Sequence, residues 1–216
     1  MEDTRAAAAP VRSKPFLRRW LLWVTMGESA GFLAPAVVAV FVVIPDTGAA
    51  LVWLTLAGAA EGTVLGLAQA HVLKRALPGL RVRAWTIRTA AGASIAWLIG
   101  LSPSTFAVQW QAWPPLLQFA VAVPAALLLL CSIGLAQWPE LRRHLPNSGW
   151  WVAGNAVAWC VGLGVFFAVA TPLWQPGQPP TTVLAIGVAA AILMAAGMAL
   201  VTGLVMGRLL AARERP

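Results

Sequence analysis

The sequence has few charged residues. Only 10% of its 216 residues are charged and 60% are hydrophobic, whereas a water-soluble domain usually carries about 25% charged residues. A chain so poor in charge cannot cover a surface that faces water. The composition therefore excludes an ordinary soluble globular protein and predicts that the solvent of this chain is largely lipid.

The motifs of catalytic, nucleotide and metal sites are also missing. The sequence holds no glycine-rich phosphate loop, no HExxH, no GxSxG and no paired-cysteine metal motif. Its two cysteines, Cys131 and Cys160, lie in apolar runs at different expected depths, where a free cysteine packs as a small hydrophobe. His71 and His144 lie in separate loops with no cluster of ligands beside them. We therefore expect no disulfide, no metal, no cofactor and no enzymatic activity.

Six long apolar segments are present. A hydrocarbon core of about 30 Å requires about 20 apolar residues in a helix. The segments of that length are 20–44, 49–73, 84–102, 116–138, 149–172 and 182–209. Because proline, glycine and asparagine interrupt the chain between them, we predict an all-α membrane protein with six transmembrane helices.

The domain boundaries follow from these segments. Residues 1–19 are basic and rich in alanine and proline, and we expect them to be disordered. The first apolar run is too long for a signal peptide and Glu28 interrupts it, which favours an uncleaved first helix. Residues 20–210 then form the transmembrane domain, and residues 211–216 a cytoplasmic tail.

The cationic residues lie on one side of the predicted topology. Of the fifteen Lys and Arg residues, Arg88 lies just inside the third span, and the other fourteen precede the first span, lie in the second and fourth loops, or stand at the end of the chain. The loops around 45–48, 103–115 and 173–181 have none. Cationic loops stay in the cytoplasm, so we predict that both termini are cytoplasmic. The net charge of +8 is then a topology signal that adds attraction to anionic lipid head groups, and we expect no nucleic-acid partner.

Most of the twelve tryptophans lie near the predicted ends of the spans. We expect them at the two membrane interfaces, where an indole keeps its ring in apolar surroundings and its N–H near polar groups. The cytoplasmic set is Trp20, Trp23, Trp85, Trp138, Trp150 and Trp151, and the outer set is Trp53, Trp110, Trp113 and Trp174. Trp97 and Trp159 lie deeper and are expected to pack between helices.

The chain contains an internal repeat. Residues 65–77 read LGLAQAHVLKRAL and residues 133–145 read IGLAQWPELRRHL. A third, degraded copy begins at Gly203. This pattern predicts three two-helix hairpins (approximately 20–80, 83–147 and 149–210) in parallel orientation, related by a pseudo-threefold axis along the membrane normal. Five of the six helices also carry small residues at four-residue steps, which allow helix backbones to approach closely and predict a compact bundle.

The segment Gly134-Leu135-Ala136-Gln137-Trp138, followed by Leu141-Arg142 and matched by Gly66-Leu67-Ala68-Gln69, resembles a known pattern. Uncharacterised small multi-pass membrane proteins of bacteria carry repeated Gly-x-x-Gln-Trp…Leu-Arg helical hairpins. The resemblance covers most of residues 50–210 and implies a topology, here in the plasma (inner) membrane, with no activity attached. Mitochondrial carriers also have three two-helix repeats, but this chain lacks their Pro-x-[Asp/Glu]-x-x-[Lys/Arg] signatures.

Polar side chains within the predicted spans are the candidates for a functional site, because an ionisable group at membrane depth costs several kcal/mol unless it is paired or hydrated. Glu61 lies near the middle of the second span, and the repeat alignment makes Asn155 equivalent to Glu28. The candidate intramembrane polar site comprises Glu61, Glu28, Asn155, Arg88, Gln69 and Gln137.

Two interpretations of these residues compete. In the first, Glu61, Glu28 and Asn155 line a path for a solute or for protons. In the second, Glu28 pairs with Arg88, Glu61 is protonated and bonded to a neighbouring helix, and the amides hold the bundle together.

Three classes of function remain open. Transport of a small solute, or transport linked to protons, is the leading specific hypothesis, although dense packing of small residues argues against a wide pore. A non-catalytic partner subunit or assembly factor is the alternative, with its protein partner unknown. An intramembrane lipid-modifying enzyme is the third, weakened by the lack of a nucleophile–base pair.

Overall fold

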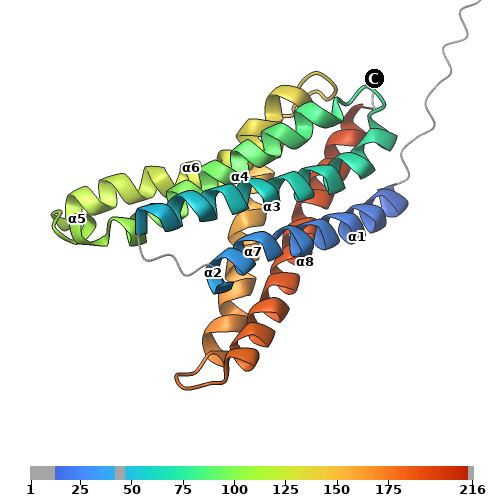
Figure 1. Ribbon diagram of the computed structural model, residues 1–216. Helices are drawn as coiled ribbons and strands as arrows, with labels where there is room; N and C mark the ends of the chain where they lie inside the picture. Colours follow the sequence, from blue (N-terminus) through green and yellow to red (C-terminus); the bar gives the residue numbers. More distant parts are fainter. Residues whose placement is uncertain (1–12, 42–46, 214–216) are drawn as a thin grey trace, which may run out of the picture.

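The computed structural model describes residues 13–41 and 47–213, and these residues form helices without any strand among them. The helices are α1 (Ser13–Gly31), α2 (Leu33–Phe41), α3 (Thr47–Ala76), α4 (Val82–Thr105), α5 (Ala107–Gln111), α6 (Pro115–Leu141), α7 (Trp150–Leu173) and α8 (Pro180–Arg213) (Figure 1). Most of the segment predicted to be disordered, part of the first predicted loop and the end of the predicted tail lie outside the described residues.

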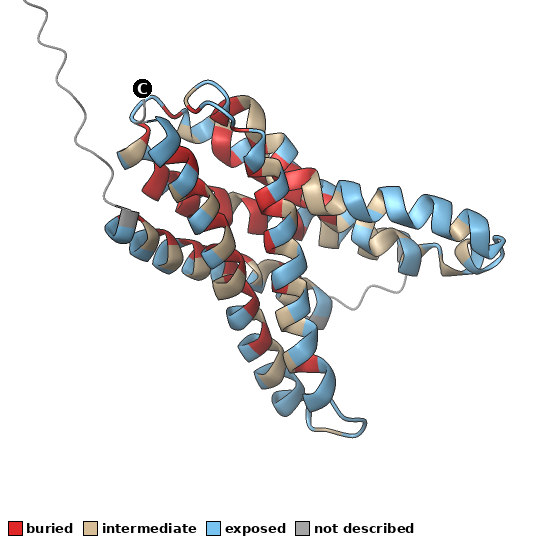
Figure 2. Ribbon diagram, turned by 180° about the vertical axis from the view of Figure 1, so that it is seen from behind, coloured by how far each residue is buried: buried red, intermediate tan, exposed pale blue. Residues whose placement is uncertain are grey.

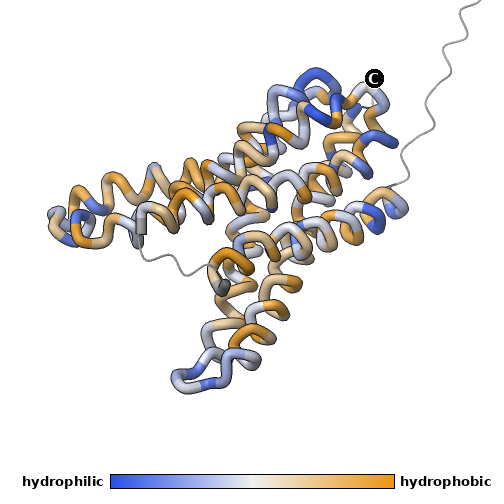
Figure 3. Tube along the Cα trace, in the orientation of Figure 1, coloured by the Kyte–Doolittle hydropathy of each residue, from blue (hydrophilic) through white to orange (hydrophobic). Residues whose placement is uncertain are grey.

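Five helical segments are long and apolar enough to cross a membrane. They are Lys14–Ala39, Gly48–Ala76, Pro115–Leu141, Trp150–Leu173 and Pro180–Arg213. The third predicted span is also helical, as α4, but Arg83 and Arg88 in its first turns make it less apolar, and it is not among the five. Figure 3 shows hydrophobic residues along the helices and hydrophilic ones at their connections. The described part of the chain therefore has only helices as regular secondary structure, and several of them have the length and composition of membrane-crossing helices.

The long helices contact one another in a closed ring. Along this ring α1 packs against α3, α3 against α4, α4 against α6, α6 against α7, α7 against α8, and α8 returns to α1. At one end, the upper right of Figure 1, the helices converge; away from it they diverge into two arms, one of α3, α4 and α6 and the other of α7 and α8. Figure 2 shows that buried residues gather where the arms meet, while the outer halves of both arms are exposed. The predicted compact bundle is thus compact in one half only.

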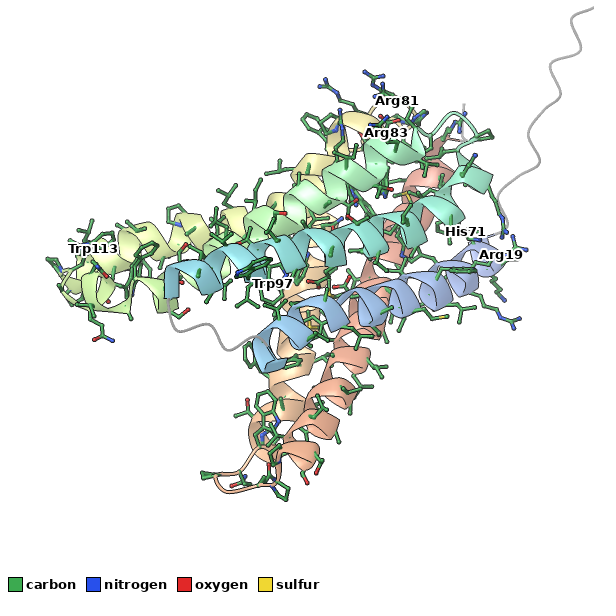
Figure 4. All side chains as sticks on the ribbon, viewed as in Figure 1. Arg19, His71, Arg81, Arg83, Trp97 and Trp113 are labelled. Carbon is green, nitrogen blue, oxygen red and sulfur yellow. The ribbon has the colours of Figure 1, made fainter. Side chains whose placement is uncertain are left out.

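The convergent end is cationic. It brings together the start of α1, the α3–α4 and α6–α7 connections and the end of α8, which contribute buried core residues such as Phe16, Leu73, Leu141 and Leu210. Figure 4 shows the labelled arginines of the α1 and α4 starts at this side and Trp113 at the far tip of an arm. We call this region the cationic end.

Three tryptophans at the cationic end are fully buried. Trp20, Trp85 and Trp151 are each 0% exposed, and the Trp151 ring lies 6.1 Å from each of the other two, between ring centroids. These three indoles therefore do not face lipid, because the rotation of α1, α4 and α7 turns them into the bundle. Trp23 and Trp150 do lie on the outside, with 38% and 71% of their surface exposed.

The predicted steps of small residues bring helices into close contact at some positions and not at others. A Cβ atom added to Gly92 would lie 2.7 Å from the Ile133 Cα atom, so α4 and α6 touch through their backbones there. A Cβ atom at Gly134 would lie 2.9 Å from the Val152 Cα atom. A Cβ atom at Gly207, by contrast, would have nothing within 4 Å of it, so this member of the α8 series makes no close helix contact.

The start of the first helix differs from the prediction. Residues 13–19 form the first turns of α1 rather than a disordered segment, because Phe16 is buried in the core at the cationic end. The first predicted span is also broken at Phe32, between α1 and α2. Pro35, which lacks a backbone N–H and is incompatible with a regular helix interior, lies just beyond this break.

Candidate functional site

Two buried carboxyl groups face one another where α1 crosses α3. Glu28 and Glu61 are 5% and 4% exposed, and their side chains lie close enough to interact electrostatically. The helices meet closely at this level, since a Cβ atom added to Gly31 would lie 2.9 Å from the Glu61 backbone oxygen. The glycine therefore lets α1 and α3 bring the two acids together.

A tryptophan of α4 holds one of these carboxyl groups. Trp97 Nε1 donates a hydrogen bond to Glu61 Oε2 at 2.7 Å. Gly58, about one turn before Glu61 on α3, leaves the space that the Trp97 indole fills, and any side chain there would collide with the ring. The Oε2 atom of Glu28, by contrast, is buried and has no hydrogen-bond partner.

The carboxyl pair borders an apolar cavity of about 310 Å³ between the two arms. Five aromatic side chains line it: Phe32, Trp97, Trp159, Phe166 and Phe167. Aliphatic residues from both arms complete the lining, among them Leu101, Leu129 and Met194. Figure 4 shows Trp97 near the place where the arms meet. We call this space the carboxyl cavity; of all its lining residues, only Glu28 and Glu61 are ionisable.

The predicted ion pair between Glu28 and Arg88 does not form. The ion pairs among the described residues all involve Glu140, and the Nη1 atom of Arg88 is buried without a hydrogen-bond partner. The order of helices explains the error, because α1 contacts α3 and α8 while α4 lies beyond α3. Glu28 therefore meets the acid on α3 rather than the base on α4.

The two glutamines of the repeated motif form a separate, buried network. Gln137 Nε2 donates to Gln69 Oε1 at 2.8 Å and to Thr89 Oγ1 at 2.7 Å. Trp85 donates to Gln69 at 3.2 Å, and Trp151 to Gln137 at 2.8 Å. These glutamines do not line the carboxyl cavity. Their hydrogen bonds instead join neighbouring helices within the bundle.

The third tryptophan finds a different acceptor. Trp20 Nε1 donates to Thr202 Oγ1 at 3.0 Å. The third copy of the motif has Met206 three residues after its glycine, where the other copies have glutamine, and Met206 packs in the core. Thr202 lies four residues earlier on the same helix face. Sequence reasoning missed it because the glutamine is absent; a polar residue one turn before Met206 was the available signal.

Asn155 takes no part in the carboxyl cavity. Its Nδ2 atom donates to the backbone oxygen of Trp151 in the preceding turn at 3.3 Å, and its Cβ atom would lie 3.1 Å from a Cβ at Gly134. The predicted equivalence with Glu28 therefore does not bring the two side chains together, since Asn155 is turned towards α6.

A further buried acid, Glu140, was not among the predicted site residues. It is 0% exposed and accepts hydrogen bonds from the Arg81 backbone N–H at 3.1 Å and from the guanidinium, the shortest at 2.6 Å. These bonds raise the pKa of Arg81. His144 Nε2 lies 3.4 Å from the same carboxylate. Glu140 thereby connects the α3–α4 connection to the end of α6. Its position next to the basic residues of the fourth loop was the signal in the sequence that could have identified it.

No family model matches this chain, and no significant match was found among curated proteins or solved structures. Among the described residues, no group of three or more His, Cys, Asp or Glu side chains could hold a metal ion. A functional hypothesis therefore rests on the carboxyl cavity itself.

Proposed function

We propose that this protein transports a small solute across the membrane in a process linked to protons. In this proposal the Glu28–Glu61 pair binds a proton and the solute alternately. The observation that carries the proposal is a pair of buried carboxyl groups that opens on a cavity and has no cationic partner among the described residues. A purely structural pair would be expensive to keep at membrane depth, where an uncompensated charge costs several kcal/mol.

The coupling follows from electrostatics. Two carboxylates in contact repel, so they do not both stay ionised without a positive charge nearby. The empty pair therefore keeps at least one proton, and a bound cation allows that proton to leave. Alternate occupation by a proton and by a solute is the elementary step of an exchanger.

The shape of the cavity supports access from one side at a time. From the carboxyl pair its lining continues to Leu101, Leu129 and Phe167, away from the cationic end. On the other side the packed core of Trp20, Trp85 and Trp151 closes the bundle. A transport cycle would have to open that core while the arms close.

We propose further that six helices cross the plasma (inner) membrane as three parallel-related hairpins, with α4 as the sixth crossing and both termini in the cytoplasm. The closed ring of helix contacts supports this arrangement. So do the three buried tryptophans, each of which donates to the helix that precedes its own around the ring: Trp20 of α1 to α8, Trp85 of α4 to α3 and Trp151 of α7 to α6. The cationic end then faces the cytoplasm, where Lys74 and other basic residues contact anionic lipid head groups.

Infrared difference spectroscopy tests whether protons reach the pair. The full chain in lipid nanodiscs is titrated between about pH 5 and 8, and wild type is compared with Glu61→Gln. A carboxyl band that changes reversibly with pH in wild type and is altered in Glu61→Gln is the expected result. If no carboxyl band responds to pH, the cavity is sealed from protons and the transport proposal fails.

A non-catalytic partner subunit is the second candidate, favoured by the exposed arms. Leu116 and Phe119 on α6 are 81% and 68% exposed, and Phe167 on α7 is 59% exposed. A protein partner seated between the arms would cover such faces and fill the carboxyl cavity. Native mass spectrometry of the protein extracted in mild detergent would detect a stoichiometric complex. A lipid-modifying enzyme has less support, because the lining of the cavity includes no Ser, Cys, Thr or His.

A further inference from the structure

We infer that the carboxyl cavity binds a monovalent organic cation with a compact apolar or aromatic body, such as a benzyl-substituted ammonium ion. This inference rests on the proposed function, since it names the class of solute that the same site takes. It is argued from the acceptor atoms, the lining and the size of the cavity.

The acceptor atoms call for a positive group. Glu61 Oε2 already accepts the N–H of Trp97 at 2.7 Å. The neighbouring Glu28 is 5% exposed, lines the cavity, and has an Oε2 atom without a hydrogen-bond partner. A buried acceptor without a donor is costly, and a positive charge placed beside it offsets this cost by electrostatic attraction, even where the ion, like a quaternary ammonium, has no N–H. A cation placed at the pair would compensate both carboxyl groups at once, which a neutral solute cannot do and an anion would oppose.

The lining distinguishes an organic cation from a metal ion. Calcium requires six to eight oxygen ligands, whereas this site offers two carboxyl groups in an otherwise apolar wall, one of them engaged by Trp97. Aromatic faces stabilise ammonium groups through cation–π attraction, and aromatic cages recognise quaternary ammonium ligands. Trp97 and Phe32 lie beside the pair with ring centroids 6.5 Å apart. Trp159, Phe166 and Phe167 supply apolar surface for the body of the ligand.

The size of the cavity limits the ligand. Its volume of about 310 Å³ is at the lower end of the range for small-molecule sites, about 300–1,000 Å³. One aromatic ring with a substituted ammonium group suits this space. A long-chain lipid would have to extend out between the arms.

Charge balance gives the binding reaction a pH dependence. One positive charge enters the pair, and one proton leaves a carboxyl group to solvent, so that the total charge of the site does not change. The residues of α4, α6, α7 and α8 that line the cavity are all uncharged, as are Phe32 and the α3 residues beside Glu61. Affinity for the cation therefore rises with pH, and protons are released on binding.

Equilibrium dialysis of the full chain in nanodiscs tests the inference, with radiolabelled benzyltrimethylammonium as the probe and empty nanodiscs as the background. We expect saturable binding that strengthens as the pH rises. Neopentylbenzene, the uncharged analogue with carbon in place of nitrogen, should not compete, and neither should sodium or calcium ions. Equal competition by neopentylbenzene would show that the cavity recognises apolar shape alone and would overturn the inference.

Three variants locate the site. Glu61→Gln should weaken binding of the probe by at least about tenfold, since it removes a buried partner of the charge. Phe166→Leu leaves both acids in place and should weaken binding less. Trp150→Phe is the control, because Trp150 is 71% exposed and does not line the cavity; the affinity of this variant for the probe should equal that of wild type. Monodisperse elution and an unchanged helical circular dichroism spectrum verify the fold of each variant. Unchanged affinity in folded Glu61→Gln would contradict the inference.

The outcomes separate the ligand class from the proposed function. Binding measured in nanodiscs requires no gradient, so binding without proton-driven uptake into sealed vesicles would refute transport and keep the ligand site. A reversible infrared titration without any binding of the probe would refute the ligand class and keep proton access.

Discussion

Gln137 donates a hydrogen bond to Gln69 across 2.8 Å, although the two residues are 68 positions apart in the chain. They occupy the same place in two copies of one motif. Trp85 and Trp151, each near the start of the helix that follows, donate to these two amides. The equivalent glutamines of successive helical hairpins therefore meet inside the bundle.

Replacement of Gln137 by leucine should destabilise the bundle. The substitution removes the acceptor of the Trp151 indole and the donor to Gln69 and Thr89. A buried polar group left without a partner costs about 1–3 kcal/mol, so the free energy of unfolding should fall by at least that amount. Unfolding in mixed micelles measures it. Gln111→Leu, at an exposed position of α5, is the control and should leave stability unchanged; equal loss in both variants would contradict the role of the network.

The contribution of Thr202 to stability should come from its hydroxyl group. Thr202→Val keeps the shape of the side chain and removes the acceptor of Trp20, which should cost about 1–3 kcal/mol. Thr202→Ser keeps the hydroxyl and should retain most of the stability. Thermal unfolding in detergent, followed by Trp fluorescence, compares the two. A serine variant less stable than the valine variant would show that the methyl group, and not the hydrogen bond, matters.

Two glycines should respond oppositely to alanine. A methyl group at Gly92 would press on the α6 backbone at Ile133, and overpacking of this kind costs about 1–3 kcal/mol. Gly207 has open space, and alanine is a better helix former by about 1 kcal/mol. Gly92→Ala should therefore lower the unfolding temperature while Gly207→Ala maintains or raises it. Thermal unfolding in detergent compares the two variants. A lower unfolding temperature in both would mean that another part of the protein packs against the α8 surface at Gly207.

Trp97 should affect the vibration of the Glu61 carboxyl group. Trp97→Phe removes the hydrogen bond to Glu61 Oε2 and should shift the carboxyl stretching band in the infrared difference spectrum to higher frequency. Trp159→Phe changes another aromatic residue of the same cavity and should leave the band in place. Identical spectra for wild type and Trp97→Phe would place the indole away from the acid in the membrane.

The Arg81–Glu140 pair should hold the cationic end together. Arg81→Met would leave a fully buried carboxylate without its guanidinium partner, and unpaired buried charges are strongly destabilising. The unfolding temperature should fall by several degrees. Arg83→Met is the matched control, because Arg83 is an exposed neighbour outside the ion pair. Both arginines are labelled in Figure 4. A similar fall in both variants would assign the effect to lost charge in general.

The sequence by itself determined where the apolar helices lie along the chain and where the positive charges gather. The apolar segments, the cationic clusters and the equivalence of Gln69 with Gln137 are all visible along the chain, because each depends on residues close together or on a repeated spacing. These features follow from local composition, which the surrounding structure does not alter.

Partners across helices were decided only by the tertiary structure. Glu28 meets Glu61 and not Arg88, Trp20 turns inward to Thr202, and Asn155 bonds its own helix. Each outcome depends on the rotation of a helix about its axis and on the order of helices around the ring, and a rotation of a few tens of degrees exchanges a lipid-facing side chain for a buried one. The divergence of the two arms, which creates the carboxyl cavity, has the same origin: small residues along a helix permit close packing, but only the facing helix determines where that packing occurs.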